Sequence, residues 1–284
     1  MKWWVALLLL PLGSVAAQGT VSRGFAVSPT VSLRIWLPAG RVQVMTWEHD
    51  SIRVTGTVAK GSTFFGGGSG TAAKFGVEQS DPASSSLARG EFVVTVPMRA
   101  QVWIKSTDAT IESWRTLGDL EILTVAGQVH VVDARGVVTV ETIDAPIRVR
   151  GAVGTVRLHS GGGALMLRDV SGDLTASTVR GTIDIASESL GDGRLETVDG
   201  HITLTGRLRP GAFLDVQSHA GTVDLQLPLD AVPSLELASR AGEVRNALGA
   251  GNPKFGRILV RSFKGAINAT GRRDVEGGKP KPSL

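Results

Sequence analysis

Apolar and polar residues alternate in short runs along most of this chain. Such alternation predicts β-strands with one buried face, because successive side chains of a strand point to opposite sides. The clearest runs before residue 100 are Val31–Ile35, Val42–Val44, Ile52–Val54 and Phe92–Val96. Gly40 and Val42 already have a small-then-aliphatic spacing that becomes regular further on. The pattern predicts an all-β protein.

From residue 106 the alternation becomes an internal repeat with three columns of residues. A Ser or Thr is followed three positions later by Gly or Ala, and two positions after that by an aliphatic residue. The hydroxyl column is Ser106, Thr124, Thr142, Ser160, Thr178, Thr197, Ser218, Ser239 and Ser262. The small-residue column is Ala109, Gly127, Ala145, Gly163, Gly181, Gly200, Gly221, Gly242 and Gly265. The aliphatic column is Ile111, Val129, Ile147, Leu165, Ile183, Ile202, Val223, Val244 and Ile267.

The spacing of these rows indicates how the chain winds. Two aliphatic residues at alternate positions precede each Ser or Thr, from Val102/Ile104 to Ile258/Val260, and only Gly193/Leu195 departs from this. The steps between small residues are 18, 18, 18, 18, 19, 21, 21 and 23. The hydroxyl-to-glycine corner never changes length, so every added residue falls at the opposite corner. Solenoids accept insertions in this way, as loops on one edge.

The repeat predicts a single-stranded parallel β-helix (a β-solenoid), right-handed because parallel crossovers usually are. We expect repeats of 18–23 residues over residues 106–270, after an N-terminal β cap and early coils over 18–105. A left-handed hexapeptide helix also uses 18-residue coils, but the nine-residue half-unit argues against it. An antiparallel meander would not need identical residues at one offset in every unit.

The corner residues have a structural explanation in this scheme. Ser and Thr hydroxyls before a turn can satisfy backbone groups at the corner. The Gly or Ala marks a sharp turn that needs positive φ or close approach of another backbone. A catalytic residue is needed once, whereas this ladder recurs nine times. We therefore predict a structural role for the whole ladder.

Residues 60–90 interrupt the alternation and predict an extended loop. The segment contains Phe64-Phe65 followed by a Gly-rich run and, later, Ser-rich stretches. Phe64 and Phe65 beside flexible glycines make this loop a candidate binding site. The alternative is a mobile hairpin whose phenylalanines pack onto the rod.

The two ends of the chain predict export and a tail. Residues 1–17 combine Lys2, an apolar run too short to span a bilayer, and Val15-Ala16-Ala17, which is typical of a signal peptide. We expect an exported protein, periplasmic, secreted or at the cell surface, with no transmembrane segment in the mature chain. Residues 271–284 are poor in apolar residues and predict a disordered tail.

Charge and candidate chemistry exclude several function classes. The formal net charge of +4 is a near balance of 30 basic and 26 acidic residues, without the basic face that nucleic-acid binding needs. The five histidines have no metal-site spacing, and Ser160-Gly161-Gly162-Gly163 is an ordinary row of the repeat. The outward column of the second strand, which begins Glu112, His130 and Arg148, changes type at nearly every step. We predict no catalytic residue, cofactor or metal.

The whole pattern resembles a family of exported bacterial β-strand-repeat domains of unknown function, described as putative adhesins. The resemblance rests on the signal peptide, Gly40-Arg-Val42-Gln-Val44-Met-Thr-Trp47, rows such as Thr178-Val-Arg-Gly181-Thr-Ile183-Asp-Ile185, and the Gly271-Arg-Arg tail. It implies the repeat architecture, and it implies no catalytic residues.

The expected function is a non-enzymatic envelope or surface protein. It would act as an adhesin-like scaffold or binding module, whose partner, an envelope polymer, a glycan or a protein, the sequence does not name. The first alternative is a carbohydrate-active β-helix enzyme, a polysaccharide lyase or hydrolase, which needs charged residues clustered in a groove. The second is an envelope protein that assembles into filaments through exposed coil ends. The oligomeric state is open.

Overall fold

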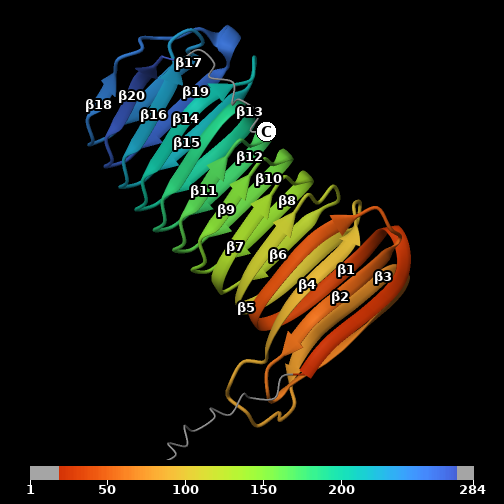
Figure 1. Cartoon of the computed structure of the whole chain (residues 1–284). Helices are drawn as coiled ribbons and strands as arrows, with labels where there is room; N and C mark the ends of the chain where they lie inside the picture. Colours follow the sequence, from red (N-terminus) through yellow and green to blue (C-terminus); the bar gives the residue numbers. More distant parts are fainter. Residues whose placement is uncertain (1–18, 274–284) are drawn as a thin grey trace, which may run out of the picture.

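The computed structural model describes residues 19–273, which form a rod built almost entirely of β-strands (Figure 1). A single 3-10 helix, Pro253–Phe255, lies between the last strands of this part. The strands are β1 Gly19–Trp47, β2 Ser51–Val58, β3 Ser62–Gln79, β4 Arg89–Pro97, β5 Gln101–Trp114, β6 Leu120–Thr124, β7 Ala126–Val132, β8 Arg135–Thr142, β9 Ile147–Arg150, β10 Val153–Ser160, β11 Leu165–Arg168, β12 Ser171–Thr178, β13 Ile183–Thr197, β14 Ile202–Leu208, β15 Phe213–Ser218, β16 Val223–Pro228, β17 Ser234–Ser239, β18 Val244–Asn246, β19 Arg257–Ser262 and β20 Ile267–Arg272. The prediction of an all-β chain is confirmed.

Each repeat contributes two strands that pair in parallel with the equivalent strands of the next repeat. β6 pairs with β8 in the register Leu120↔Val138, and β7 pairs with β9 in the register Val129↔Ile147. The strands that lead up to the Ser/Thr corner form one side of the rod, here called sheet 1. The strands that follow the corner form the other side, sheet 2. β1, β5 and β13 bend and contribute to both. The solenoid-like stacking predicted from the columns is therefore present.

The core lies between the two sheets and consists of the alternate aliphatic positions. Val140, Ile147, Ile183 and Val216 are each fully buried, with exposed fractions of 0%. Burying such a side chain contributes roughly 1.5–3 kcal/mol. Because like residues stack along the rod, each repeat completes the core of its neighbours, and no repeat has a core of its own.

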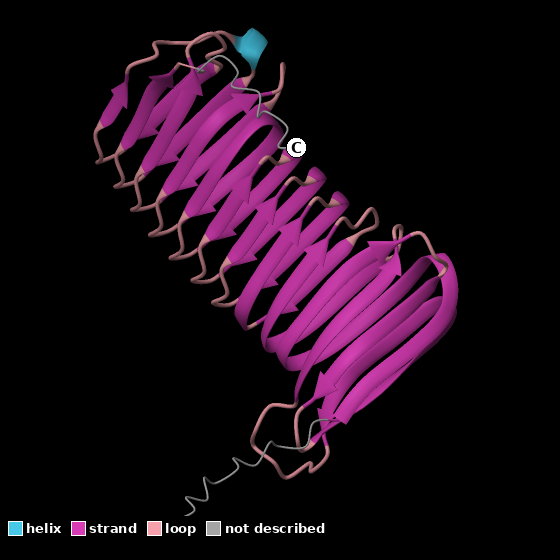
Figure 2. Ribbon diagram, viewed as in Figure 1, coloured by secondary structure: helices cyan, strands magenta, loops and turns pink. Residues whose placement is uncertain are grey.

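The Ser/Thr corner is held by the hydrogen bonds that the sequence predicts. Figure 2 shows these corners as short turns of similar shape along one edge of the rod. The bonds within single corners are Gly163 N–H to Ser160 Oγ (2.8 Å), Gly181 N–H to Thr178 Oγ1 (3.0 Å), Gly200 N–H to Thr197 Oγ1 (2.9 Å), Gly242 N–H to Ser239 Oγ (2.9 Å), Thr124 Oγ1 to Ala126 O (2.8 Å), Thr142 Oγ1 to Ala145 O (3.0 Å) and Ser218 Oγ to Gly221 O (2.6 Å). In the described chain, the buried hydroxyls of Ser106 and Ser262 have no partner.

The corner glycines are required mainly by close backbone approach. Within this column only Gly127 has a positive φ, +95°. A Cβ on Gly200 would instead lie 1.7 Å from the carbonyl oxygen of Gly181, and a Cβ on Gly221 would lie 1.7 Å from that of Gly200. The glycine of one coil thus leaves room for the carbonyl of the next.

The spatial order of the coils departs from the order of the sequence at both ends of the rod. β19 lies between β15 and β17, and β20 lies between β16 and β18. After β16 the chain therefore first forms β17 and β18 at the end of the rod. It then returns, and β19 and β20 occupy the coil between these strands and β15 and β16. At the other end, β1 lies between β5 on one side and β3 and β4 on the other. Sequential stacking of the nine rows, as the repeat implies, fails for the last two.

The predicted loop over residues 60–90 is wrong for most of its length. β3 occupies Ser62–Gln79, and residues 72–76 pair in parallel with β1. Its two halves face each other, since Gly61 O accepts from Ser80 N (2.8 Å), so the segment doubles back near Gly70, where φ is +56°. Gly68 is a tight contact point, since a Cβ there would lie 2.4 Å from that of Ala73. The Gly-rich run thus forms an edge arm whose small residues lie against its partner, and only 60–61 and 80–88 lack strand structure.

β2 interrupts the parallel stacking near this end of the rod. It pairs antiparallel with the start of β1 on one side and with β4 on the other, and it buries Ile52 and Val54 completely. The predicted signal peptide (1–17) lies outside the described residues. So does the predicted tail beyond residue 273, although Gly271 and Arg272 belong to β20, where Arg272 forms an ion pair with Glu188.

Candidate binding face

Phe64 and Phe65, the predicted binding residues, point to opposite sides of β3. The Phe64 ring packs against Phe75 and Phe92, with centroid distances of 5.9 and 5.8 Å, and lies against the hydrophobic core. Phe64 is therefore a structural residue and not an adhesive tip. Phe65 is half-buried and lies on the outer surface of sheet 1.

Phe65 meets Trp36 across a glycine. β3 and β1 place Gly76 directly beside Trp36. A Cβ on Gly76 would lie 2.6 Å from Cζ of Phe65 and 2.9 Å from Cβ of Trp36, so the two aromatic residues flank this position. Trp36 is 45% exposed, and the ammonium of Lys105 lies 4.9 Å from the centroid of its ring. Trp36, Phe65 and Leu87 line a shallow groove of about 470 Å³.

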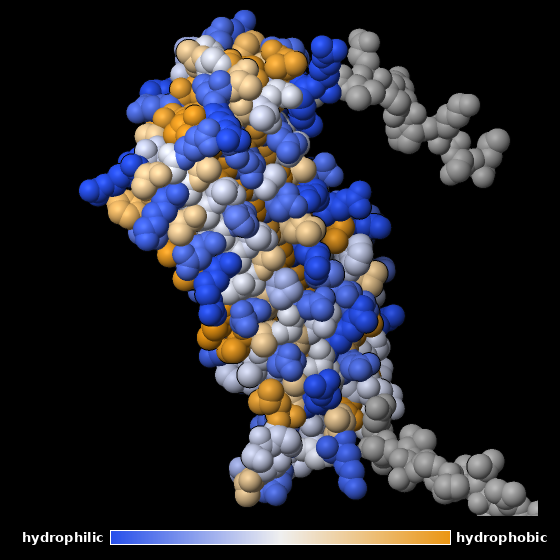
Figure 3. All heavy atoms as spheres, turned by 90° about the vertical axis from the view of Figure 1, so that its left-hand side faces the viewer, coloured by the Kyte–Doolittle hydropathy of each residue, from blue (hydrophilic) through white to orange (hydrophobic). Residues whose placement is uncertain are grey.

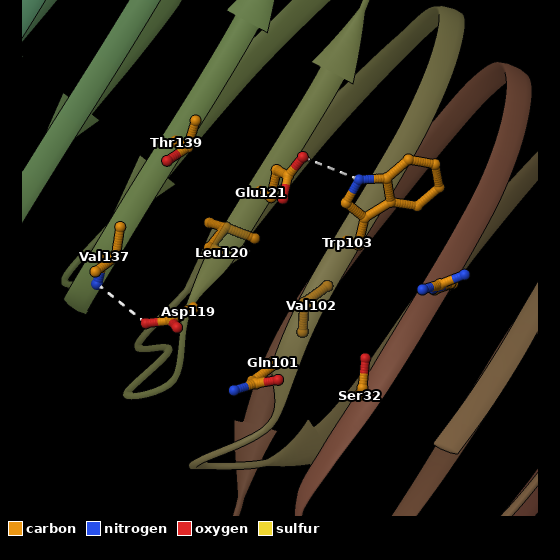
Figure 4. Close-up of a pocket in the computed structure, with 10 residues that line it drawn as sticks. Ser32, Gln101, Val102, Trp103, Asp119, Leu120, Glu121, Val137 and Thr139 are labelled. Atoms are coloured by element: carbon orange, nitrogen blue, oxygen red, sulfur yellow. Dashed lines mark hydrogen bonds between the residues drawn. The ribbon is translucent and has the colours of Figure 1, made fainter. Parts of the chain in front are cut away.

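A second tryptophan lies on the same outer surface, one coil further along. Arg34 of β1 is in register with Trp103 of β5, which is in register with Glu121 of β6. Trp103 Nε1 donates to Glu121 Oε1 at 3.1 Å, as the dashed line in Figure 4 shows. These residues line a groove of about 570 Å³ whose rim also includes Gln101.

Together Trp36, Phe65 and Trp103 form what we call the aromatic face, on the outside of sheet 1 near the β2 end of the rod. Charged side chains surround it. Lys74 stands beside Arg34 in the neighbouring strand, whereas Glu121 and Asp119 lie on the side of β6. Flat aromatic rings with hydrogen-bonding groups at their edges suit ligands that have both apolar faces and polar edges. Sugar rings are such ligands.

A polar network on the outside of sheet 2 has a structural character. Glu112, only 9% exposed, accepts from Arg41 Nη2 (2.6 Å) and from Gln43 Nε2 (2.7 Å). His130, one coil along, lies 3.2 Å from Arg148 through Nε2 and Nη1. Burial lowers the pKa of His130, and the charge of Arg148 lowers it further, while Glu112 acts in the opposite direction. Both oxygens of the Glu112 carboxylate therefore accept a hydrogen bond, and the group forms a satisfied ion-pair network.

The predicted outward column of sheet 2 is confirmed in register as far as Asp224. Beyond it Asn268 precedes Arg245, because of the exchanged end coils. Arg41 and Gln43 were not predicted from the sequence as partners of Glu112. The signal was present, since the Gly40–Val42 spacing matches Ala109–Ile111, and the two segments are indeed in register.

Exposed apolar residues also recur along the Ser/Thr corners, where the residue after the hydroxyl is 38–63% exposed in five rows: Val125, Ile143, Val179, Val198 and Phe263. Figure 3 shows apolar and hydrophilic residues interspersed over the side that it presents. Within residues 19–273, no group of three or more His, Cys, Asp or Glu side chains has a metal-binding arrangement. Over the same range, no helix has the length and apolar character needed to cross a membrane.

Comparison with known proteins gives one matching family and two similar solved structures. A family model described as Toastrack DUF4097 matches residues 31–254. Two solved structures are similar. A putative adhesin from Bacteroides fragilis is 9% identical, with a TM-score of 0.38, over 90% of this chain and 99% of that one. A putative cell adhesion protein from Clostridium sporogenes is 11% identical, with a TM-score of 0.25, over 89% and 100%. No curated protein matches.

Proposed function

Because this chain belongs to the Toastrack DUF4097 family, we propose that it is a non-enzymatic, exported binding module. It holds an adhesin-like position at the envelope or cell surface and binds a glycan polymer through the aromatic face. The coils wind as one right-handed β-helix, the usual direction for parallel crossovers.

The observation that carries this proposal is the position of the aromatic residues. Phe and Trp make up only 5% of the chain, yet Trp36, Phe65 and Trp103 gather on one side of one end. Trp36 is 45% exposed, and tryptophan is enriched among the residues that dominate binding interfaces. No feature of the core requires this arrangement.

The shape of the site favours a polymer over a small molecule. The two grooves are open and neighbour each other on sheet 1, since Arg34 lines one of them and Trp36, two residues further along β1, lines the other. An extended chain laid across several coils can stack one ring on Trp36 and another on Trp103. Lys105, Arg34, Gln101 and Glu121 then supply hydrogen bonds at the edges of the sugar rings. The rigid backbone of the stacked coils holds these groups in place before binding, which lowers the entropic cost of association.

The proposal predicts that Trp36→Ala/Trp103→Ala weakens binding to its polymer by about 100-fold, since each exposed anchor contributes on the order of 1–2 kcal/mol. Binding of the mature protein is measured by co-sedimentation with purified peptidoglycan sacculi and by affinity electrophoresis in a series of soluble polysaccharides. The matched control is Trp114→Ala, because Trp114 is 40% exposed on the opposite sheet. Equal loss in both variants, or binding by wild type to none of these polymers, contradicts the proposal.

A further inference from the structure

The C-terminal end of the rod presents an open sheet edge. In the described part of the chain, β17 pairs only with β19 and β18 pairs only with β20, so neither has a partner strand on its outer side (Figure 1). The loop that follows β18 covers only the beginning of this edge, through the bonds from Leu235 N–H to Ala250 O (3.1 Å) and from Asn252 N–H to Val232 O (3.0 Å). Unpaired strand edges are templates for pairing with another strand.

The same end leaves the core columns uncovered. Val244 is 40% exposed, whereas the residues that continue its column inward, Ile267 and Val223, are both 0% exposed. Leu235 and Leu237 of β17 are only partly buried. Leu248 of the loop after β18 packs partly against the core, so this apolar end is only partly covered, and β18 has no strand on its outer edge in the described chain.

The two ends of the rod differ, and this determines which partner fits. At the opposite end, β2 runs antiparallel between β4 and the start of β1, so the outer segment there is the start of β1 and not a coil with the columns of the repeat. Head-to-tail stacking of copies would have to join β17 and β18 to this differently built end. An open end is instead complementary to the open end of a second copy, in an isologous contact.

The residues of β18 are self-complementary in charge. Glu243, Val244 and Arg245 are all exposed, with Val244 at the centre. When this segment pairs antiparallel with the same segment of a second copy, with the two Val244 residues opposite each other, Glu243 of each copy lies opposite Arg245 of the other. The contact then has two such charge pairs. In a single copy these two side chains bond to each other at 2.7 Å, which shows that they occupy one face and reach the same space. Opposite charges across an antiparallel pair are stabilising and like charges are destabilising.

We propose that this chain forms a two-fold symmetric dimer through its C-terminal end, with β17 and β18 each pairing antiparallel with the same strand of a second copy. The two-fold axis is normal to the sheets, so sheet 1 of one copy continues into sheet 1 of the other. Both aromatic faces then look in the same direction from the two distal ends of a doubled rod. If the proposed function holds, one dimer binds a polymer at two points, and avidity follows.

The test is sedimentation velocity of the mature chain across a range of concentrations, in the absence of any polymer. Wild type is expected to show a monomer–dimer equilibrium without larger species. Arg245→Glu places carboxylates opposite carboxylates and is expected to raise the dimer dissociation constant about tenfold. The charge exchange Glu243→Arg/Arg245→Glu keeps the complementarity and restores the wild-type value. An equimolar mixture of Arg245→Glu and Glu243→Arg is expected to form mixed dimers, although each variant alone dimerises weakly.

Arg194→Glu is the matched control, because Arg194 bonds to Glu196 at 2.8 Å in the same spacing on an exposed strand in the middle of the rod. Its dimerisation should equal that of wild type. A wild-type chain that stays monomeric at every concentration overturns the proposal. So does a dimer that Arg245→Glu leaves unchanged, a chain of larger oligomers, or a dimer that appears only when residues 274–284 are removed, since that would identify the tail as the occupant. None of these results depends on polymer binding.

Discussion

Replacing Ile258 and Val260 by alanine should destabilise the protein by roughly 5 kcal/mol, the sum of two large-to-small changes in a packed core. Both residues belong to β19, near the end of the described chain. In space, however, β19 lies between β15 and β17, and the two side chains are 1% and 0% exposed. The substitutions leave cavities within the rod, where neighbours on both sides lose contacts.

The matched variant is Leu235→Ala/Leu237→Ala, which changes the same two columns in β17. These residues precede β19 in the sequence but lie at the end of the rod, where they are only partly buried. We expect a loss of roughly 2 kcal/mol, because the cost of truncation falls with the apolar area that was buried. Urea unfolding monitored by circular dichroism compares the two. If coils stacked in sequence order, the ranking of the two variants would be reversed.

Gly200→Ala is expected to destabilise the protein by about 3 kcal/mol, through overpacking of a backbone contact. The new Cβ would lie 1.7 Å from the carbonyl oxygen of Gly181 and 2.7 Å from Oγ1 of Thr197. Backbone atoms of neighbouring coils cannot rotate away as a long side chain can. The corner must therefore open, and the hydrogen bond from Gly200 N–H to Thr197 weakens with it.

Gly67→Ala provides the control for this change. Gly67 lies in β3, and a Cβ there would meet no atom within 4 Å. The substitution is expected to be neutral or slightly stabilising, because alanine lowers the entropy of the unfolded chain. Thermal unfolding of both variants gives the comparison. Equal effects at the two positions would show that the corner does not depend on close approach.

The columns of the repeat were predictable because they follow directly from the stacking of equivalent residues. Once Thr142 and Ser160 occupy the same corner in consecutive coils, their hydrogen bonds and the parallel register of β8 and β10 follow. The order of the end coils was not predictable on these grounds. Every row offers the same aliphatic pairs, so Ser218 can stack on Ser239 or on Ser262 with equal chemistry, and the longer connections decide for Ser262.

The segment 60–90 was mispredicted for a different reason. Glycine carries no hydrophobic signal, so the run at Gly66–Gly68 lacks the alternation that marks a strand. In the structure Gly66 and Gly68 are needed because their own hairpin partner lies too close for side chains: a Cβ on Gly66 would be 2.8 Å from that of Phe75, and a Cβ on Gly68 2.4 Å from that of Ala73, whereas Gly67 faces open space. A local pattern does not contain this tertiary contact.

One of the three aromatic residues of the candidate site was predicted from the sequence. Phe65 was named from the sequence, but its neighbours Trp36 and Trp103 were not, because they come from two other strands. What brings them together is the position of β1 between β3 and β5, the same departure from sequence order that places β19. The outward position of Trp36 between inward Ile35 and Leu37 was the available signal.

Hydroxyl-radical footprinting of the protein with and without bound polymer tests the binding role of the aromatic face most directly. Oxidation of each tryptophan is quantified by mass spectrometry, using the polysaccharide that the binding measurements identify. Bound polymer is expected to protect Trp36 and Trp103 from oxidation and to leave Trp114, on the opposite sheet, as reactive as before. Protection of Trp114 with unchanged reactivity at Trp36 and Trp103 would contradict it.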